Sequence, residues 1–165
     1  LFNPAHHSYF CLDDSNDIRS HEIRIAADYY LPVNEEAIPT GEIATVAGTS
    51  FDFRVPRLIG NIPFDHNYCL SAKRSLLRQV ASVRSPRSGV EMHLATTEPG
   101  LQFYNGYKLG PPVPGLIKPL YAPFSGLCLE PQIWPDAPNN PHFPTAVLQP
   151  DSVYQQQTTF AFHSG

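Results

Sequence analysis

Apolar and polar residues alternate with a period of two in three segments of the chain. This pattern predicts β-strands, because successive side chains of a strand point to opposite faces. Residues 21–33 read HEIRIAADYYLPV, and one parity carries Ile23, Ile25, Ala27, Tyr29 and Leu31. Residues 90–95 alternate in the same way through Val90, Met92 and Leu94. Residues 154–162 place on one face Tyr154, Gln156, Thr158, Phe160 and Phe162. We therefore expect a half-buried strand in each segment.

Proline and glycine separate these segments, and such residues mark turns and loops. We expect turns or loops at residues 39–41, 85–89 and 110–115. Residues 131–144 hold five prolines. This stretch is expected to form an ordered irregular loop, since Ile133, Trp134 and Phe143 supply side chains that it can bury.

One segment, residues 71–83 (SAKRSLLRQVASV), is open to two interpretations. It lacks Gly and Pro and could form a short helix by propensity, but its apolar residues have no clean period. We predict a strand over residues 75–83, because the neighbouring segments are strand-like. Many short strands with proline-rich connections predict an all-β fold, either an antiparallel sandwich or a barrel.

The composition agrees with this fold class and excludes several functions. The 165 residues suit a single domain, and 18 prolines with 10 glycines exclude a helical bundle. A net charge of −4 leaves no basic footprint for nucleic acid. No apolar run approaches the ~20 residues of a membrane helix, and no signal peptide is present, so we expect a cytoplasmic location. Three widely spaced cysteines form neither a disulfide framework nor a zinc motif, and we expect them to be buried in strands.

Two polar clusters contain histidine. In residues 3–10 (NPAHHSYF), His6 and His7 are adjacent. Adjacent residues of a strand face opposite sides, so only one of the two can serve a given site. In residues 64–68 (FDHNY), Asp65 stands beside His66 and Asn67. This group could bind a metal or sugar hydroxyls, or it could form a turn in which Asp65 accepts backbone N–H groups.

Two further clusters place a polar side chain next to an apolar strand. Residues 96–104 (TTEPGLQFY) break at the Pro-Gly pair and re-enter a strand at Gln102. In residues 128–132 (CLEPQ), Glu130 follows Leu129, and burial there would raise the pKa of the carboxyl and suit a general base. Carboxylates, amides, imidazole and aromatic faces are the groups that a neutral sugar site combines. The P-loop, GxSxG, HExxH and GxGxxG motifs are absent from the sequence.

Taken together, the clusters resemble the aldose 1-epimerase (galactose mutarotase) family, in order and over nearly the whole chain. Residues 3–12 (NPAHHSYFCL) are similar to its N-x-x-N-H-[ST]-Y-[FW]-N-L segment. Residues 21–32 resemble its H-x-[IL]-x-[IV]-x-A-D-x-Y-x-P strand, and residues 64–70 (FDHNYCL) resemble Y-D-H-N-[FY]-V-L. Two specific segments of the family match TTEPGLQFYNG at residues 96–106 and CLEPQIWPDAPNNPHFP at residues 128–144.

The resemblance implies roles for six residues. His7 maps to the general acid of the family, because it directly precedes Ser-Tyr, and Glu130 maps to the general base. Substrate-binding or site-wall roles are implied for Ser8, Tyr9, Asp65 and Gln102. The chain departs from the family pattern at His6, which replaces an Asn, and at Phe64, which replaces a Tyr. No metal and no cofactor are implied.

The resemblance also implies a fold and an activity. Residues 1–165 are expected to form one partial domain, the C-terminal half of a galactose mutarotase-like supersandwich. The N-terminal half, where the family has an Asn-Arg pair and an L-H-G-G histidine, is not part of it. The implied activity is the interconversion of the α and β anomers of free aldohexoses such as galactose and glucose, with a monosaccharide as the partner. Two alternatives stay open. One is a non-catalytic carbohydrate-binding module. The other is a hexose-6-phosphate 1-epimerase relative, whose candidate phosphate ligands are Arg54 and Arg57.

Overall fold

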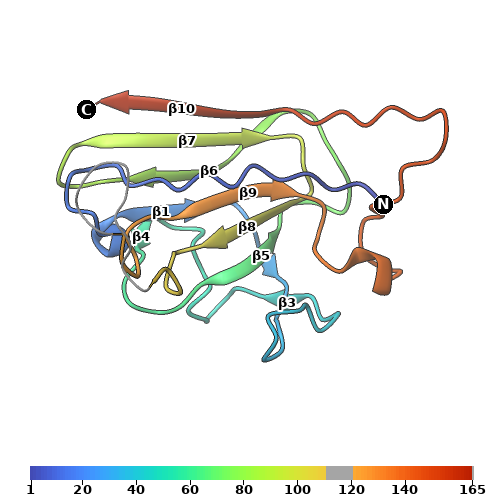
Figure 1. Ribbon diagram of the computed structural model, residues 1–165, viewed down its shortest axis with the longest axis horizontal. Helices are drawn as coiled ribbons and strands as arrows, with labels where there is room; N and C mark the ends of the chain where they lie inside the picture. The colour runs from blue at the N-terminus through green and yellow to red at the C-terminus, as the bar shows by residue number, and fades with distance from the viewer. Residues whose placement is uncertain (111–120, 165) are drawn as a thin grey trace.

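Two antiparallel sheets of five strands each make up the part of the chain that the computed structural model describes, residues 1–110 and 121–164 (Figure 1). The first sheet has the order β10 (Thr158–Ser164), β7 (Val90–Thr96), β6 (Arg78–Arg84), β1 (Glu22–Ile25) and β4 (Arg57–Leu58). The second sheet has the order β3 (Ala44–Thr45), β2 (Tyr29–Tyr30), β5 (Asp65–Cys69), β8 (Gly100–Tyr104) and β9 (Cys128–Gln132). The all-β antiparallel fold expected from the sequence is confirmed.

Helical structure in the described residues is confined to two short 3₁₀ turns, η1 (Ile18–Ser20) and η2 (Ala137–Asn139). A membrane-crossing helix needs a long apolar run, and no helix in this part of the chain has one. The connections between strands are therefore turns and irregular loops, as the many prolines indicate.

The hydrophobic core lies between the two sheets and follows the alternation seen in the sequence. Met92 and Leu94 of β7 are fully buried, whereas Glu91 and His93 are partly exposed. The strand expected at residues 90–95 is thereby confirmed. The other sheet contributes the buried side chains Tyr68, Leu101, Phe103 and Leu129. Burial of each large apolar side chain stabilises the fold by about 1.5–3 kcal/mol, so this layer holds the two sheets together.

Residues 21–33 form two strands, and the prediction of a single strand is wrong. β1 ends at Ile25 in the first sheet, and β2 begins at Tyr29 in the second. Between them, the Ala26 N–H donates to the carbonyl of Val80, and the chain then crosses to the other sheet. The crossing changes the face of the sheet on which the odd-numbered residues lie. Tyr29 is therefore 49% exposed, although the odd-numbered Ile25 is buried.

Two other strands begin later than expected. β6 starts at Arg78, and its register against β7 shifts between Gln79 and Ala81. This irregularity lets both Val80 and Ala81 be buried, which explains why the segment shows no clean hydrophobic period. β10 likewise begins only at Thr158. The predictions of strands in these two segments are confirmed in kind, but their N-terminal boundaries are wrong.

The proline-rich segment 131–144 is ordered and largely irregular, as expected. Ile133, Trp134 and Phe143 are buried together in a second apolar cluster. Pro131 still belongs to β9, which is the last strand of its sheet, and a proline is tolerated on such an edge. The loop expected at residues 110–115 lies, apart from Gly110, outside the described residues.

The three cysteines are free. Cys69 and Cys128 are buried in β5 and β9, as expected. Cys11 is only half-buried and belongs to no strand, so the prediction for this residue is wrong. It lies just after Phe10, which forms a single bridge to Leu127 instead of continuing into a strand.

A buried ion pair ties the turn between β7 and β8 to the rest of the fold. Glu98 is fully buried, and its two carboxylate oxygens accept hydrogen bonds of 2.5 and 3.2 Å from the Arg74 guanidinium. The guanidinium also lies over the Tyr154 ring, 4.3 Å from its centroid. Without Arg74, the buried carboxylate would lose both of these hydrogen bonds and its paired charge.

We expect Arg74→Ala to lower the free energy of unfolding by about 3–5 kcal/mol, because it leaves a buried charge uncompensated. Arg87→Ala is the matched control, since Arg87 pairs with Asp14 at the surface, where both side chains are largely exposed and ion pairs contribute little. Urea unfolding followed by Trp134 fluorescence compares the two. Adding Glu98→Gln to Arg74→Ala should recover part of the loss. Equal unfolding midpoints for the two arginine variants would contradict this account.

Candidate active site

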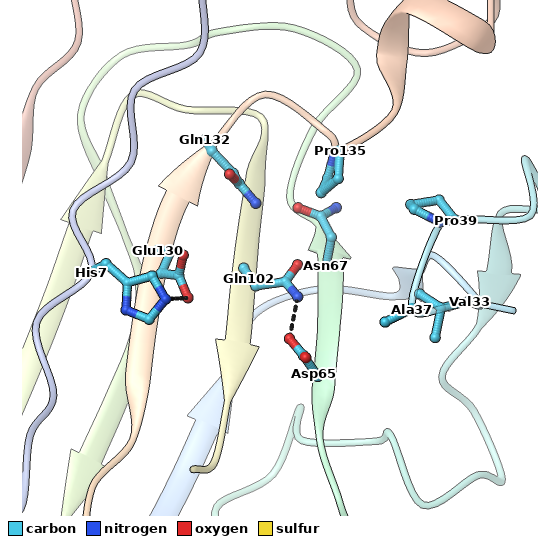
Figure 2. Close-up of a pocket in the computed structure, with 10 residues that line it drawn as sticks. All are labelled: His7, Val33, Ala37, Pro39, Asp65, Asn67, Gln102, Glu130, Gln132 and Pro135. Carbon is cyan, nitrogen blue, oxygen red and sulfur yellow. Dashed lines mark hydrogen bonds and ion pairs between the residues drawn. The ribbon is translucent and has the colours of Figure 1, made fainter. Parts of the chain in front are cut away.

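Three neighbouring strands of the second sheet form the floor of a pocket. In β5, β8 and β9, one parity of residues faces the core and the other faces outward. The register of these strands places Asn67, Gln102 and Glu130 in one row across the sheet. Asp65 of β5 and Gln132 of β9 share this outward face, and Figure 2 shows the five side chains around one space.

The N-terminal segment brings His7 to the same space. It runs beside β9 between two anchors. The Asn3 side chain donates to the carbonyl of Ile133 and accepts from its N–H, at 3.0 and 2.8 Å. Phe10 exchanges two backbone hydrogen bonds of 2.9 Å with Leu127. Because β9 lies between Leu127 and Ile133, His7 is held across from the middle of this strand, although its own segment is not a strand.

His7 and Glu130 form a close pair at the edge of the pocket (Figure 2). Nε2 of His7 lies 3.6 Å from Oε1 of Glu130, and the two side chains are 55% and 10% exposed. Burial raises the pKa of the Glu130 carboxyl, and the nearby His7 only partly opposes this effect. A carboxyl with a raised pKa beside an imidazole can act as a general acid–base pair, in which one group takes a proton while the other gives one.

The pocket has a volume of about 260 Å³. Its lining consists of His7, Val33, Ala37, Pro39, Asp65, Asn67, Gln102, Glu130, Gln132 and Pro135. Four residues expected from the sequence, His7, Asp65, Gln102 and Glu130, are thus brought together from four segments. Nε2 of Gln102 donates to Oδ1 of Asp65 at 2.8 Å. Asp65 is therefore a strand residue in a side-chain pair, and the alternative interpretation as a turn cap is wrong.

Ser8 and Tyr9 do not line this pocket. Ser8 is exposed, and its hydroxyl lies 3.1 Å from Nε2 of His6. Tyr9 lines a separate cavity of about 520 Å³. His6 packs with its ring 5.1 Å from that of Phe160 and does not line the pocket. Only one of the two adjacent histidines faces the pocket, as expected, although their segment is not a strand. The structure therefore separates two of the six expected residues from the other four.

Asn67 is a lining residue of the group 64–68, which the sequence offered as a possible metal or sugar site, but it was not among the six residues given individual roles. It is 1% exposed, and within the described residues neither Oδ1 nor Nδ2 has a hydrogen-bond partner. Gly100 makes room for it, because a Cβ there would lie 2.5 Å from Oδ1 of Asn67. A buried amide without partners costs free energy, and a ligand that formed a hydrogen bond with it would remove this cost. In the sequence, Asn67 lies two positions after Asp65, and this spacing places both residues on the same face of a strand.

Two groups of side chains have their ligand atoms within 4.8 Å of one another, close enough for a metal ion: His7, Cys128 and Glu130, and Cys11, Asp13 and His21. In the first group, burial raises the pKa of the Cys128 thiol to about 12, so a metal would have to displace its proton. In the second group, Nε2 of His21 accepts the Leu12 N–H at 2.9 Å, and Asp13 accepts the Ser85 hydroxyl at 2.6 Å. The second group thus joins the N-terminal segment to the turn after β6.

Comparison with known proteins relates the whole chain to one family. A family model described as aldose 1-epimerase matches residues 1–161. The chain is 45% identical to galactose mutarotase of Mus musculus over 97% of this chain and 49% of that protein. It is 37% identical to aldose 1-epimerase of Escherichia coli (strain K12) over 97% of this chain and 50% of that protein. The crystal structure of an aldose epimerase homologue from C. elegans matches with a TM-score of 0.91 at 27% identity, covering 99% of this chain and 52% of the other. The chain thus spans about half the length of the curated relatives it matches.

Proposed function

Since the chain belongs to the aldose 1-epimerase family, we propose that the protein interconverts the α and β anomers of free aldohexoses such as galactose and glucose. The observation that carries this proposal is the pair of His7 and Glu130, 3.6 Å apart at the edge of a pocket. The pocket floor consists of carboxylate and amide side chains, which offer acceptors and donors to the hydroxyls of a neutral sugar.

Anomer exchange requires one proton to be removed and another to be delivered. The Glu130 carboxylate takes the proton of the anomeric hydroxyl, and protonated His7 gives a proton to the ring oxygen as the bond from C1 to that oxygen breaks. The sugar opens to the aldehyde, and rotation about the C1–C2 bond presents the other face of the carbonyl. On closure, the C5 hydroxyl attacks C1 and returns its proton to His7, while Glu130 protonates the aldehyde oxygen. Both groups regain their starting states, so no further reactant is consumed.

Asp65, Gln102 and Asn67 are proposed to hold the ring hydroxyls. The hydrogen bond from Gln102 to Asp65 fixes both side chains, and within the described residues it leaves Oε1 of Gln102 without a partner. Asn67 and Gln102 lie in the row of residues that ends at Glu130, and Asp65 lies on the same face of β5. A sugar bound to them presents C1 and the ring oxygen to the acid–base pair, and such orientation lowers the entropic part of the barrier.

The pocket lining favours a neutral sugar over a sugar phosphate. None of the ten lining residues in the described part of the chain is Lys or Arg. Arg54 pairs with Asp52 and Asp28, and Arg57 lies over the Phe53 ring. Phosphate recognition ordinarily uses arginine or lysine, and neither candidate arginine lines the pocket. The unphosphorylated substrate is therefore the one we propose.

Polarimetry of freshly dissolved α-galactose and α-glucose tests the proposed function. We expect the approach to equilibrium rotation to accelerate in proportion to protein concentration. The assay uses the 165-residue chain and the longest product of its coding sequence, because the chain covers about half the length of its relatives. A non-catalytic carbohydrate-binding module would show sugar binding by saturation-transfer NMR without acceleration. Binding without acceleration in both proteins would overturn the enzymatic proposal.

Asn67→Ala is expected to raise KM for galactose about tenfold with kcat changed less, because a hydrogen bond to a substrate hydroxyl contributes about 1.4 kcal/mol. The free energy of unfolding should stay unchanged or rise, since the alanine removes a buried amide that has no partner within the described residues. Steady-state kinetics and urea unfolding measure the two effects. A destabilised variant with unchanged KM would show that Asn67 is structural.

A cytoplasmic location is part of the same proposal. Cys11, Cys69 and Cys128 are all free, and free thiols are typical of the reducing cytosol. Fractionation of cells that express the tagged full-length product measures the location directly.

A further inference from the structure

The side of the His7 ring that faces away from Glu130 has partners of its own. Sγ of Cys128 lies 3.4 Å from Nδ1 of His7, and the Tyr9 side chain is a neighbour of the same thiol. Cys128 is fully buried, and the rings of His7 and Tyr9 lie 5.4 Å apart. Cys128 and Glu130 are two residues apart on β9 and share a face. Strand β9 thus places a thiol next to Nδ1 of His7 and a carboxylate next to Nε2.

We propose that Cys128 is a positioning residue that keeps Nδ1 of His7 hydrogen-bonded, so that only Nε2 exchanges protons. This inference rests on the proposed acid–base role of His7. A neutral imidazole has two tautomers, and only the one with its hydrogen on Nδ1 leaves Nε2 free to take back the proton that it gave. Nδ1 therefore donates a hydrogen bond throughout the cycle, and the atom placed to accept it is the sulfur of Cys128.

A thiol suits this position because its sulfur is a weak hydrogen-bond acceptor and because the group stays neutral. Burial raises the pKa of Cys128 to about 12, so no thiolate stands beside the imidazole at neutral pH. A full negative charge there would favour the imidazolium and hold back the proton that His7 has to deliver. Sulfur is a weak acceptor, so it orients the ring without this cost. Burial likewise raises the pKa of Tyr9 to about 12, so this neighbouring hydroxyl is neutral as well.

His7 needs such a partner because little else orients its ring. Its side chain is 55% exposed, and its segment has no regular structure between the anchors at Asn3 and Phe10. The torsion that turns an imidazole about its last bond is broad, and the Glu130 oxygen at 3.6 Å restrains only one edge of the ring. The Cys128 sulfur restrains the opposite edge of the ring, and the two contacts together fix the orientation of the imidazole. Other strands add two titratable groups near this cluster, Tyr104 on β8 and Asp65 on β5.

Two substitutions and a matched control test the proposal. Cys128→Ala removes the hydrogen-bond acceptor at Nδ1 of His7. Cys128→Ser replaces the sulfur with a hydroxyl oxygen, which is smaller and a stronger acceptor. Cys69→Ala is the control, because Cys69 is also a buried free cysteine of the same sheet, whereas the thiol that contacts His7 is that of Cys128. The ¹⁵N NMR shifts of the His7 ring in the 165-residue chain report its tautomer, and the loss of one signal set in His7→Asn assigns them. The kcat, KM and pH profile of mutarotation are measured on the full-length product.

For Cys128→Ala we expect a mixture of His7 tautomers, a kcat lowered about tenfold by misorientation of the acid, and a KM within about twofold of wild type. Cys128→Ser should recover a single tautomer and part of kcat, and its altered acceptor should move the alkaline limb of the pH profile. Cys69→Ala should leave the tautomer and kcat unchanged. An unchanged His7 tautomer in Cys128→Ala overturns the proposal, and so does an unchanged kcat when the wild type is active. If the wild type shows no mutarotation, the proposed function fails, while the NMR result still decides whether Cys128 positions the ring.

Discussion

Replacing Glu130 by glutamine is expected to slow the interconversion of galactose or glucose anomers by at least about 10²-fold in the full-length protein. Glutamine keeps the shape of the side chain and its place in the row with Gln102 and Asn67, but it cannot take the proton of the anomeric hydroxyl. Because binding contacts remain, the loss should appear mainly in kcat rather than in KM. Polarimetry at several sugar concentrations separates the two parameters.

The pH profile provides a second readout for the same residue. Burial raises the pKa of Glu130, so the acid limb of the wild-type profile should lie above the ordinary range of a glutamate. Activity requires the ionised form and is lost as pH falls through this raised value. In Glu130→Gln that limb should disappear from whatever activity remains.

Loss of stability should not account for the loss of activity. A carboxyl whose pKa is raised on folding binds its proton more tightly in the native state, so stability falls as pH rises from the unfolded pKa to the folded one. Glutamine removes this cost, and at neutral pH Glu130→Gln should unfold at the same or a higher urea concentration than wild type. Near-wild-type mutarotation in this folded variant would refute the assignment of Glu130 as the base.

Replacing His7 by asparagine is expected to lower kcat by a comparable factor, at least about 10²-fold. Asparagine is polar and of similar size, but it cannot deliver a proton to the ring oxygen at neutral pH. The His7 side chain is 55% exposed, so its replacement should leave the fold intact, as circular dichroism and urea unfolding can show.

The adjacent histidine provides the matched control. His6→Asn changes the same side chain one position away, but His6 packs near Phe160 and does not line the pocket. We expect mutarotation within about twofold of wild type, because the substituted group is not among those that touch the sugar in the proposed mechanism. If His6→Asn were as damaging as His7→Asn, the assignment of the acid to His7 would be wrong.

The alternation within individual strands could be predicted from the sequence, whereas the ends of the strands could not. Met92 and Leu94 face the core as their period of two predicts, because strand geometry is local. The break after Ile25 depends instead on the passage of the chain from the first sheet, where β1 pairs with β6, to the second, where β2 pairs with β5. The late start of β6 goes with a register shift against β7. Both features arise from partners that are distant in the chain, so no local pattern reports them.

The candidate site could be predicted in part, and largely through resemblance to a family rather than through residue chemistry. The residues alone left Asp65 open between a turn and a ligand-binding group. Ser8 and Tyr9 show the limit of the inference. They follow His7 directly, but in an irregular segment successive side chains point in unrelated directions, and neither reaches the pocket. Asn67 shows the converse. Its spacing from Asp65 could be seen in the sequence, but the lack of hydrogen-bond partners for its amide within the described residues could not.

By itself, the sequence determined that this protein consists of strands and which parity of each strand is apolar, because that pattern depends only on neighbours along the chain. Only the tertiary structure decided that Asn67, Gln102 and Glu130 stand in one row, since the register between strands sets it. The tertiary structure also decided the position of His7 opposite this row. The anchor at Asn3 is 130 positions away from its partner Ile133, so no local pattern in the sequence reports it.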